Sequence, residues 1–353
     1  MDRFKRLFLW ALYGLATVQF VWCYLWLVRP YVQTVWYEHG EERMPFQGRL
    51  LMMYPMRWSH TNAPLVWLSS WLSHYIFWFP RVVSPEVLTQ AAISLVCIGI
   101  TGWAATRIYE AASERKLLTP LIYPLVLILC VATYVLHTIQ NFRFIYDLPS
   151  LAFFSLALYV LYFRKPLRWF VAIFLVATIN RETTLLLLAF FLLDRAVVRG
   201  CLDWHRLYAW SELRIVLPLG AFWGAWQIWI HHLFAHSRSE MYSRMPQNLS
   251  FFVLPQAWPQ MLGGCCYLLP IVVIFRKDLR DPRLRAWLWV LPAWFGFMFV
   301  YGILIETRIF GELIPYVAVA GALMGETVLA RRIGNAQPAT EQMKLSEPLR
   351  DAA

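Results

Sequence analysis

Long apolar runs, each close to the length that crosses a lipid bilayer, alternate with short charged segments along the chain. A spanning helix needs about 20 mostly apolar residues. The clearest candidates are Leu7–Val28, Glu86–Thr106, Leu117–Leu136, Leu148–Phe163, Glu212–His232, Trp258–Phe275, Ala286–Ile305 and Leu313–Leu329. The pattern therefore predicts an all-α polytopic membrane protein.

Two further apolar runs are interrupted by polar residues. Trp169–Leu193 is broken at its middle by Asn180-Arg181-Glu182-Thr183, and neither half is long enough to span. We expect a hairpin of two short helices that turns at this point. Ala63–Phe79 is aromatic but contains Ser and His, and we expect it to lie flat on the membrane surface.

The distribution of basic residues orients these segments. With Ala63–Phe79 lying flat, 22 of the 32 Lys and Arg residues, including every lysine, fall on one side, which the positive-inside rule makes cytoplasmic. The result is about ten membrane segments in a single transmembrane domain, residues 1–330, with both termini cytoplasmic. It includes a long outer loop, 29–85, with interfacial helices, and residues 331–353 form a disordered cytoplasmic tail. A bacterial inner membrane is the expected location.

Composition agrees with this topology. Hydrophobic residues make up 59% of the chain and charged residues 15%, against about 25% charged residues in an average soluble domain. These values exclude a soluble domain and a disordered chain. The net charge of +11 is explained by basic cytoplasmic loops and does not require nucleic acid as a partner. The six cysteines contain no CxxC pair, so they indicate neither a disulfide framework nor a zinc site.

This topology, which follows from charge bias alone, places unusual polar residues together on the outer face. Ionisable groups at membrane depth cost at least about 2.5 kcal/mol unless they are paired or hydrated, so they mark candidate sites. The outer set comprises Glu38, His39, Glu41, Glu42, Arg43, Arg49, Arg57, His60, His137, Asn141, Arg143, Asp147, Asn180, Arg181, Glu182, His231, His232, His236, Arg238, Glu240, Arg244, Glu306, Arg308 and Glu312.

The break at Asn180–Thr183 is the strongest of these signals. Helix ends at membrane depth leave unpaired backbone groups, which are tolerated where protein or a water-filled cavity meets them. Together with an arginine they suit an anion, most simply a phosphate. The alternative is an internal ion pair between Arg181 and Glu182 that joins the two helices. Asp147 is similarly either a catalytic acid or a helix cap before Pro149.

The histidines of the last long outer loop raise a different possibility. His232 and His236 have the i, i+4 spacing of a helical metal site, but no HExxH motif is present. We therefore predict no metal ligands here, and expect His231 to hydrogen-bond a phosphate.

The layout resembles the GT-C superfamily of integral-membrane glycosyltransferases, which use polyprenyl-phosphate-linked sugars. The resemblance lies in the cytoplasmic start and first span (Met1–Val28), the acidic outer loop with Glu38, Glu41 and Glu42, and the broken helix at Asn180–Thr183. It is architectural and covers the chain up to about His232. The acid that marks the family's first outer loop is an Asp, which this loop lacks; Glu41 or Glu42 replaces it, or Asp147 is the base.

The resemblance implies sugar transfer from a lipid-linked donor at the outer face of the membrane. Glu42 or Glu41, with Asp147 behind them, would deprotonate the acceptor hydroxyl. The donor phosphate would be bound by Arg181 and Arg308, supported by Asn180, Glu182, Glu312, Arg143, Arg49 and His231. The cofactor remains unknown, since a divalent metal such as Mg²⁺ or Mn²⁺ is compatible with this chemistry.

Two other functions stay open. An oligosaccharide polymerase or ligase would use a metal-free Arg and His site, in which Arg238, Arg244 and the histidines of His231–His236 matter more than Glu41 and Glu42. A non-enzymatic carrier or flippase for an anionic lipid would need access from both sides. The sequence shows basic residues on the cytoplasmic side only in loops, which disfavours the carrier. It does not indicate the sugar, the acceptor or the oligomeric state.

Overall fold

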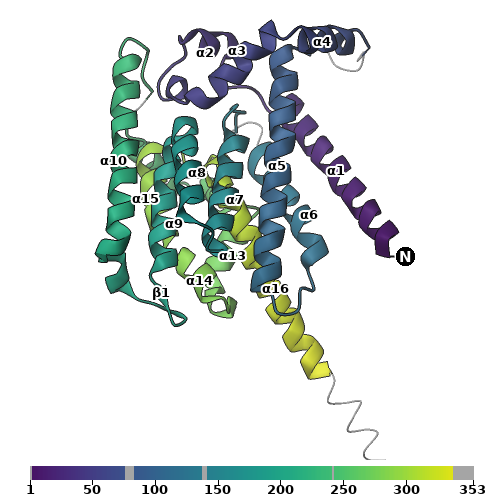
Figure 1. Ribbon diagram of the computed structural model, residues 1–353, viewed down its shortest axis with the longest axis vertical. Coiled ribbons are helices and arrows are strands. Elements are labelled where there is room, and N and C mark those ends of the chain that lie inside the picture. Colours follow the sequence, from purple (N-terminus) through teal and green to yellow (C-terminus); the bar gives the residue numbers. More distant parts are fainter. Residues whose placement is uncertain (1, 76–82, 137–140, 241, 337–353) are drawn as a thin grey trace, which may run out of the picture.

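The computed structural model describes residues 2–75, 83–136, 141–240 and 242–336. Nearly all regular structure in these residues is helical (Figure 1). The α-helices are α1 (Asp2–Leu27), α2 (Thr34–His39), α3 (Met53–Thr61), α4 (Ala63–Tyr75), α5 (Pro85–Ala112), α6 (Thr119–Cys130), α7 (Asp147–Tyr162), α8 (Leu167–Asn180), α9 (Leu186–Arg195), α10 (Trp210–Leu233), α11 (Met245–Val253), α12 (Trp258–Leu262), α13 (Leu268–Ile274), α14 (Pro282–Trp287), α15 (Val290–Tyr301) and α16 (Ile314–Ala336).

Shorter elements connect these helices. The 3₁₀ turns are η1 (Phe46–Gly48), η2 (Leu50–Met52), η4 (Glu182–Leu185), η5 (Trp204–Tyr208), η6 (Pro255–Ala257), η7 (Arg276–Asp278) and η8 (Thr307–Leu313). A π-helical turn, η3 (Val131–Val135), extends α6. A short β-hairpin follows α9; its strands, β1 (Val197–Val198) and β2 (Cys201–Leu202), have two residues each.

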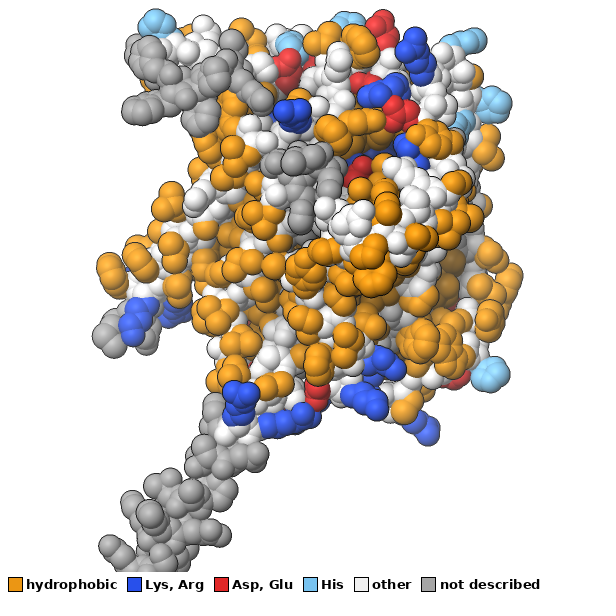
Figure 2. All heavy atoms as spheres, turned by 180° about the vertical axis from the view of Figure 1, so that it is seen from behind, with side chains coloured by type: hydrophobic (Ala, Val, Ile, Leu, Met, Phe, Trp, Pro, Cys, Tyr) orange, Lys and Arg blue, Asp and Glu red, His pale blue; other side chains and the backbone are white. Residues whose placement is uncertain are grey.

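Five helical stretches are long and apolar enough to cross a membrane: Arg3–Leu27, Pro85–Ala112, Trp210–Leu233, Pro282–Tyr301 and Thr307–Arg332. Shorter apolar helices cover Thr119–Val135, Asp147–Tyr162 and Leu167–Asn180. A broad hydrophobic band crosses the middle of the face in Figure 2, with charged side chains gathered at both ends. The fold is therefore all-α, with a surface suited to a lipid bilayer.

These five stretches do not establish the ten membrane segments expected from the sequence, and one expected segment, Trp258–Phe275, is not continuous. This run is not one helix, because α12 ends at Leu262 and α13 begins at Leu268. Between them Cys265, Cys266 and Tyr267 all have positive φ angles, of 52°, 56° and 60°. The turn lies against η8, since a Cβ on Gly264 would be 2.6 Å from the ring of Phe310.

The loop between α1 and α5 carries α2, α3 and α4 across one end of the bundle (Figure 1). α4 lies across the end of the bundle, beside the start of α5 (Figure 1). The last residues of the predicted interfacial stretch, 76–79, lie outside the described residues. This arrangement puts the loop directly above the turn between α8 and α9, because η2 packs on α8.

The predicted hairpin is present. α8 ends at Asn180, Arg181 adopts an extended conformation, and the chain returns through η4 into α9. Phe170, near the start of α8, stacks on Phe191, near the end of α9, with ring centroids 5.1 Å apart. Only an antiparallel pair of helices brings these two rings together.

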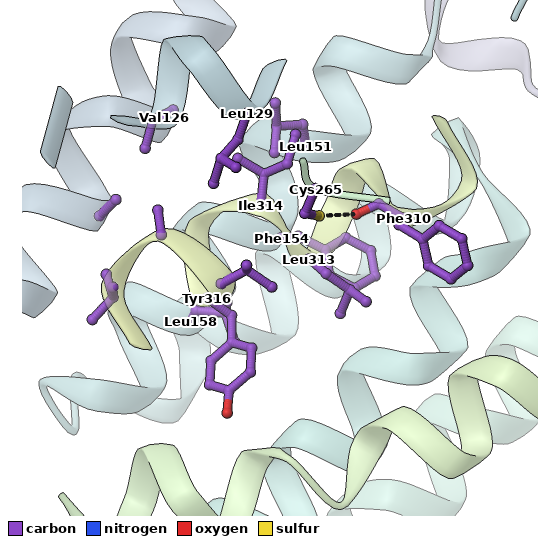
Figure 3. Close-up of a cluster of buried hydrophobic side chains, with 14 of the residues drawn as sticks. Val126, Leu129, Leu151, Phe154, Leu158, Cys265, Phe310, Leu313, Ile314 and Tyr316 are labelled. Atoms are coloured by element: carbon purple, nitrogen blue, oxygen red, sulfur yellow. Dashed lines mark hydrogen bonds between the residues drawn. The ribbon is translucent and has the colours of Figure 1, made fainter. Parts of the chain in front are cut away.

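α7 lies at the centre of the hydrophobic core and packs against α5, α8, α9 and α16. Leu151, Phe154 and Leu158 of α7 lie in one cluster with Leu313, Ile314 and Tyr316 (Figure 3). Cys265 Sγ also reaches the backbone oxygen of Phe310, at 3.5 Å. The core thus fixes η8 beside the first turn of α7, so that the polar side chains of these two elements meet.

α16 extends further than the predicted domain boundary. Residues 331–336, assigned to a disordered tail by the sequence pattern, form the last turns of this helix, which ends at Ala336. The rest of the predicted tail, 337–353, lies outside the described residues.

Candidate functional site

One buried arginine joins two buried carboxylates at the turn between α8 and α9. Arg181 Nη1 lies 3.1 Å from Asp147 Oδ1 and 2.9 Å from Glu312 Oε1. The three residues come from the break, from the first turn of α7 and from η8. Their side chains are at most 5% exposed. Since a buried charge is tolerated only when it is paired, Arg181 is essential to this cluster.

Arg308 brings a second positive charge to the cluster. Its Nη1 lies 3.9 Å from Asp147 Oδ1, and its Nη2 lies 2.6 Å from Glu306 Oε2. The guanidinium carbon stands 3.9 Å from the centroid of the Phe144 ring, a cation–π contact. Arg308 therefore connects the buried Asp147 to Glu306.

Glu312 is held in place by hydroxyl groups and by a close backbone approach. Ser150 Oγ and Thr183 Oγ1 each donate to Glu312 Oε1 over 2.9 Å. The preceding residue, Gly311, packs so closely on Tyr134 of η3 that a Cβ would lie 1.9 Å from the phenol oxygen. Glycine is required here, because any side chain would push η8, and Glu312 with it, away from the cluster.

Arg181 and Glu182 do not pair with each other, which corrects the internal ion pair considered from the sequence. Glu182 instead binds Arg49 of the outer loop, with the Arg49 Nη2–Glu182 Oε1 distance at 3.0 Å and Nε contacts to both oxygens. Arg49 also stacks on the ring of Tyr146, 4.2 Å from its centroid. Because the backbone of Arg181 is extended, the side chains of Arg181 and Glu182 point in different directions. Arg181 binds the acids inside the bundle, and Glu182 binds the outer loop, so this turn joins the loop to the bundle.

Asn180 acts as a local brace. Its side-chain nitrogen donates to the backbone oxygen of Tyr146 over 3.1 Å, which links the end of α8 to the turn before α7. The backbone N–H of Arg181 donates to Ala177 O over 2.9 Å and so ends α8. Asn180 thus supports the geometry of the cluster and does not line the cavity.

A cavity of about 330 Å³ opens beside this cluster, between the outer loop, α10, α15 and η8. Figure 2 shows red and blue side chains at the same end of the molecule as the outer loop. The charged side chains that line the cavity are Arg49, Arg181, Glu182, Glu240, Arg244, Glu306 and Arg308. Aromatic rings supply much of the remaining wall: Tyr31, Phe46, Phe142, Phe144, Trp223, Tyr242, Phe297 and Tyr301. The cavity suits a ligand with both an anionic and an apolar or carbohydrate part.

Unused hydrogen-bonding atoms concentrate around the cluster. Within the described part of the chain, Arg181 Nε, Arg308 Nε, Asp147 Oδ2 and Glu312 Oε2 are buried and have no hydrogen-bond partner. Buried polar groups are normally satisfied, so a set of exceptions in one place needs a reason. Two buried guanidinium groups beside the cavity thus keep hydrogen-bond donors that the described residues do not use.

The first-loop acids that the sequence favoured as bases lie elsewhere. Glu41 is exposed, and Glu42 is 1% exposed without lining the cavity. Glu42 Oε2 accepts from the backbone N–H of Gln33 over 2.9 Å, and Oε1 accepts from the N–H and Nε of Arg43. Its carboxylate therefore folds the loop, and the carboxylates that reach the cavity are Glu182, Glu240 and Glu306.

Arg143 and His231 also differ in their placement. Arg143 donates to the backbone oxygen of Leu25, and its own N–H donates to Arg29 O over 2.8 Å, so it fastens the end of α1. It does not line the cavity, whereas the exposed His231 does. α10 ends at Leu233, so His236 lies beyond the helix and the helical metal spacing with His232 does not apply.

The aromatic residues that line the cavity, Tyr31 and Trp223 among them, were not predicted from the sequence. Tyr31 donates its hydroxyl to Glu240 Oε2 over 2.9 Å, and Arg43 pairs with the other oxygen. Burial, followed by the hydrogen bond to Glu240, raises the pKa of Tyr31, so the phenol stays a neutral donor. Trp223 Nε1 donates to Glu182 O over 3.0 Å. The sequence feature that indicates an aromatic lining is the segment Phe142–Asp147, in which aromatic and charged residues alternate.

No protein family, curated protein or solved structure matches the chain.

Proposed function

We propose that the protein is an integral-membrane glycosyltransferase that moves a sugar from a polyprenyl-phosphate donor to an acceptor at the outer face. The observation that supports this most is the cavity of about 330 Å³, where four arginines and an aromatic wall meet next to buried acids. A lipid-linked sugar phosphate presents the matching chemistry: an anion, a carbohydrate and a prenyl chain. Charged groups that lie among apolar helices are a default sign of function.

The donor phosphate is placed at Arg308 and Arg181 in this proposal. Each keeps an unpartnered Nε within the described residues, and guanidinium groups bind phosphate oxygens through paired N–H donors. As the bond between the sugar anomeric carbon and the phosphate oxygen breaks, the negative charge on the leaving phosphate increases. Fixed cations that meet this charge lower the barrier. Asp147 and Glu312 hold Arg181 in position for this role.

The acceptor must lose a proton as its oxygen bonds to the anomeric carbon. We assign the base to Glu306, in place of Glu42 or Glu41, because its carboxylate lines the cavity while contacting Arg308 through Oε2. Glu182 is engaged by Arg49 through both oxygens, and Glu240 is engaged by Arg43 and Tyr31. Glu306 is thus the acid with the least occupied carboxylate in the cavity.

The proposal places the cavity and the outer loop outside the cytoplasm, with both termini inside. Single cysteines replacing Glu41 and Ser239, both exposed, should react with a membrane-impermeant maleimide in intact cells. Cysteines replacing Glu114 and His205, exposed near the other end, should react only after permeabilisation. The background protein carries serine at Cys201 and Cys266, the two exposed native cysteines. Labelling with the opposite sidedness would place the site in the cytoplasm and contradict a lipid-linked donor.

Donor binding tests the assignment of Arg308. Arg308→Gln should weaken binding of farnesyl phosphate, a short prenyl phosphate probe, by about 10- to 100-fold, because a hydrogen bond to a charged group contributes about 1.5–3 kcal/mol. The purified protein would be titrated in detergent by microscale thermophoresis, and transfer would be assayed from polyprenyl-phosphate sugars. Arg115→Ala, an exposed arginine at the opposite end, is the matched control. Unchanged affinity in Arg308→Gln would remove this residue from the phosphate site.

The oligosaccharide polymerase or ligase remains a second candidate, because of one observation. The cavity is lined by Arg49, Arg181, Arg244, Arg308 and His231, while Glu41 and Glu42 lie off it. That reaction also transfers a glycosyl group from a lipid-linked donor. It predicts that His231→Gln and Arg244→Ala abolish turnover, whereas Glu306→Gln does not.

A further inference from the structure

A histidine and two glutamates converge at a second place, away from the cavity. His60 Nε2 lies 3.1 Å from Glu38 Oε2 and 2.9 Å from Glu86 Oε1. One ligand atom from each of the three residues lies within 4.8 Å of the other two. They come from α2, α3 and the first turn of α5, so three elements meet at this point. None of the three lines the cavity.

Hydrogen bonding alone does not account for this cluster. His60 Nε2 carries at most one hydrogen, which can point fully at only one of the two carboxylates. The second oxygens, Glu38 Oε1 and Glu86 Oε2, are buried and have no partner among the described residues. Glu38 is 6% exposed, so its carboxylate is largely removed from water. Two such carboxylates beside one imidazole leave unbalanced negative charge that a cation would neutralise.

Among the residues that the structure describes, neighbouring charges do not supply that cation. Arg57 Nε donates to the backbone oxygen of Glu38 and not to its carboxylate. His39 hydrogen-bonds through Nδ1 to Val35 O over 2.7 Å, which turns it to its own helix. His60 is 43% exposed, so the cluster opens to solvent on one side and an ion can enter there.

We propose that Glu38, His60 and Glu86 bind a divalent zinc ion. One imidazole nitrogen and two carboxylate oxygens are common zinc ligands, with bonds of about 2.0–2.2 Å, so neighbouring ligand atoms in a tetrahedral site lie about 3.4 Å apart. The two N···O distances here are 3.1 Å and 2.9 Å, and shifts of a few tenths of an ångström make them fit. Solvent water supplies the fourth ligand on the exposed side of His60.

The ion has a structural role in this proposal. It fastens α2 and α3 to the N-terminus of α5, and these helices hold the outer loop that carries Arg49 over the cavity. Zinc binding releases free energy that stabilises the folded state by mass action. The proposal is independent of the glycosyltransferase assignment, because its measurements are metal content and stability.

The test uses the full-length protein in detergent, purified without a polyhistidine tag and stripped with EDTA. After incubation with Zn²⁺ and gel filtration, we expect the wild type to retain one zinc per chain by mass spectrometry and to melt at a higher temperature. Glu38→Gln and His60→Gln should weaken zinc binding at least about 100-fold, since even outer-shell partners contribute about 10–100-fold. Co²⁺ in the wild type should give the visible absorption of a tetrahedral site.

Two controls separate this site from other histidines. His39→Gln changes the residue next to Glu38 and should keep the zinc. A combined His231→Gln, His232→Gln and His236→Gln variant removes exposed histidines at the end of α10 and should also keep it. His60→Gln alters a half-exposed side chain, so it tests the site even where Glu38→Gln fails to fold. A wild type that retains no zinc, or a His60→Gln protein that retains it fully, would overturn the proposal.

Discussion

Arg181→Ala is expected to lower the free energy of unfolding by about 3–5 kcal/mol, the cost of breaking a buried ion pair by removing one partner. The reason is that Asp147 and Glu312 both depend on this guanidinium, at 3.1 Å and 2.9 Å, and neither side chain is exposed. Arg308 approaches Asp147 only to 3.9 Å and does not replace the lost contact. Unfolding in mixed detergent micelles, followed by circular dichroism, measures the change.

A matched pair of variants identifies the source of this loss. Arg49→Ala also removes an arginine from a carboxylate, but Glu182 is 18% exposed, so about 1–3 kcal/mol is expected. The double variant Arg181→Ala/Asp147→Ala should recover part of the stability of Arg181→Ala, because it removes one stranded charge. Wild-type stability in Arg181→Ala, or a double variant that is less stable than the single one, would show that the cluster does not hold the helices together.

The helices and the hairpin were predictable because their signals are local. Asn180–Thr183 interrupts an apolar run, and an interrupted run too short to span must turn back. The π-helical turn after α6 and the break at Gly263–Tyr267 were not predicted, since both depend on packing against η8. The paired glycines and cysteines of that break looked apolar enough to continue a helix.

The site was only half predictable, for a different reason. Arg181, Glu182, Arg308 and Glu312 were singled out because a charge among apolar residues is costly wherever the chain folds. Their partners depend on which elements meet, and spacing along the chain does not determine that. The three acids of the outer loop illustrate this: Glu41 is exposed, Glu42 bonds to the loop backbone, and Glu38 faces His60. Nothing in their sequence positions separates these environments.

Replacing the assigned base has the largest expected effect on activity. Glu306→Gln should reduce turnover by about 10²–10⁴-fold, the usual contribution of general-base catalysis, since the amide keeps the shape of the side chain but cannot accept the acceptor proton. Affinity for farnesyl phosphate should change little, because Arg308 remains and loses only its partner at 2.6 Å. The assay is initial-rate transfer in proteoliposomes at saturating lipid-linked donor.

The controls for Glu306→Gln are the other acids of this region. Both carboxylate oxygens of Glu240 are already engaged by Tyr31 and Arg43, so Glu240 is not the assigned base. Glu240→Gln keeps the shape of this side chain, and its turnover should stay within about tenfold of the wild-type value. Glu42→Gln removes the charge that fixes Arg43. It should therefore lower the melting temperature and leave the turnover of the folded enzyme close to that of the wild type. If Glu306→Gln turns over like the wild type while His231→Gln does not, the base assignment is wrong. The arginine and histidine site of a polymerase or ligase would then account for the cavity, because the donor contacts of Arg308 and Arg181 serve both reactions.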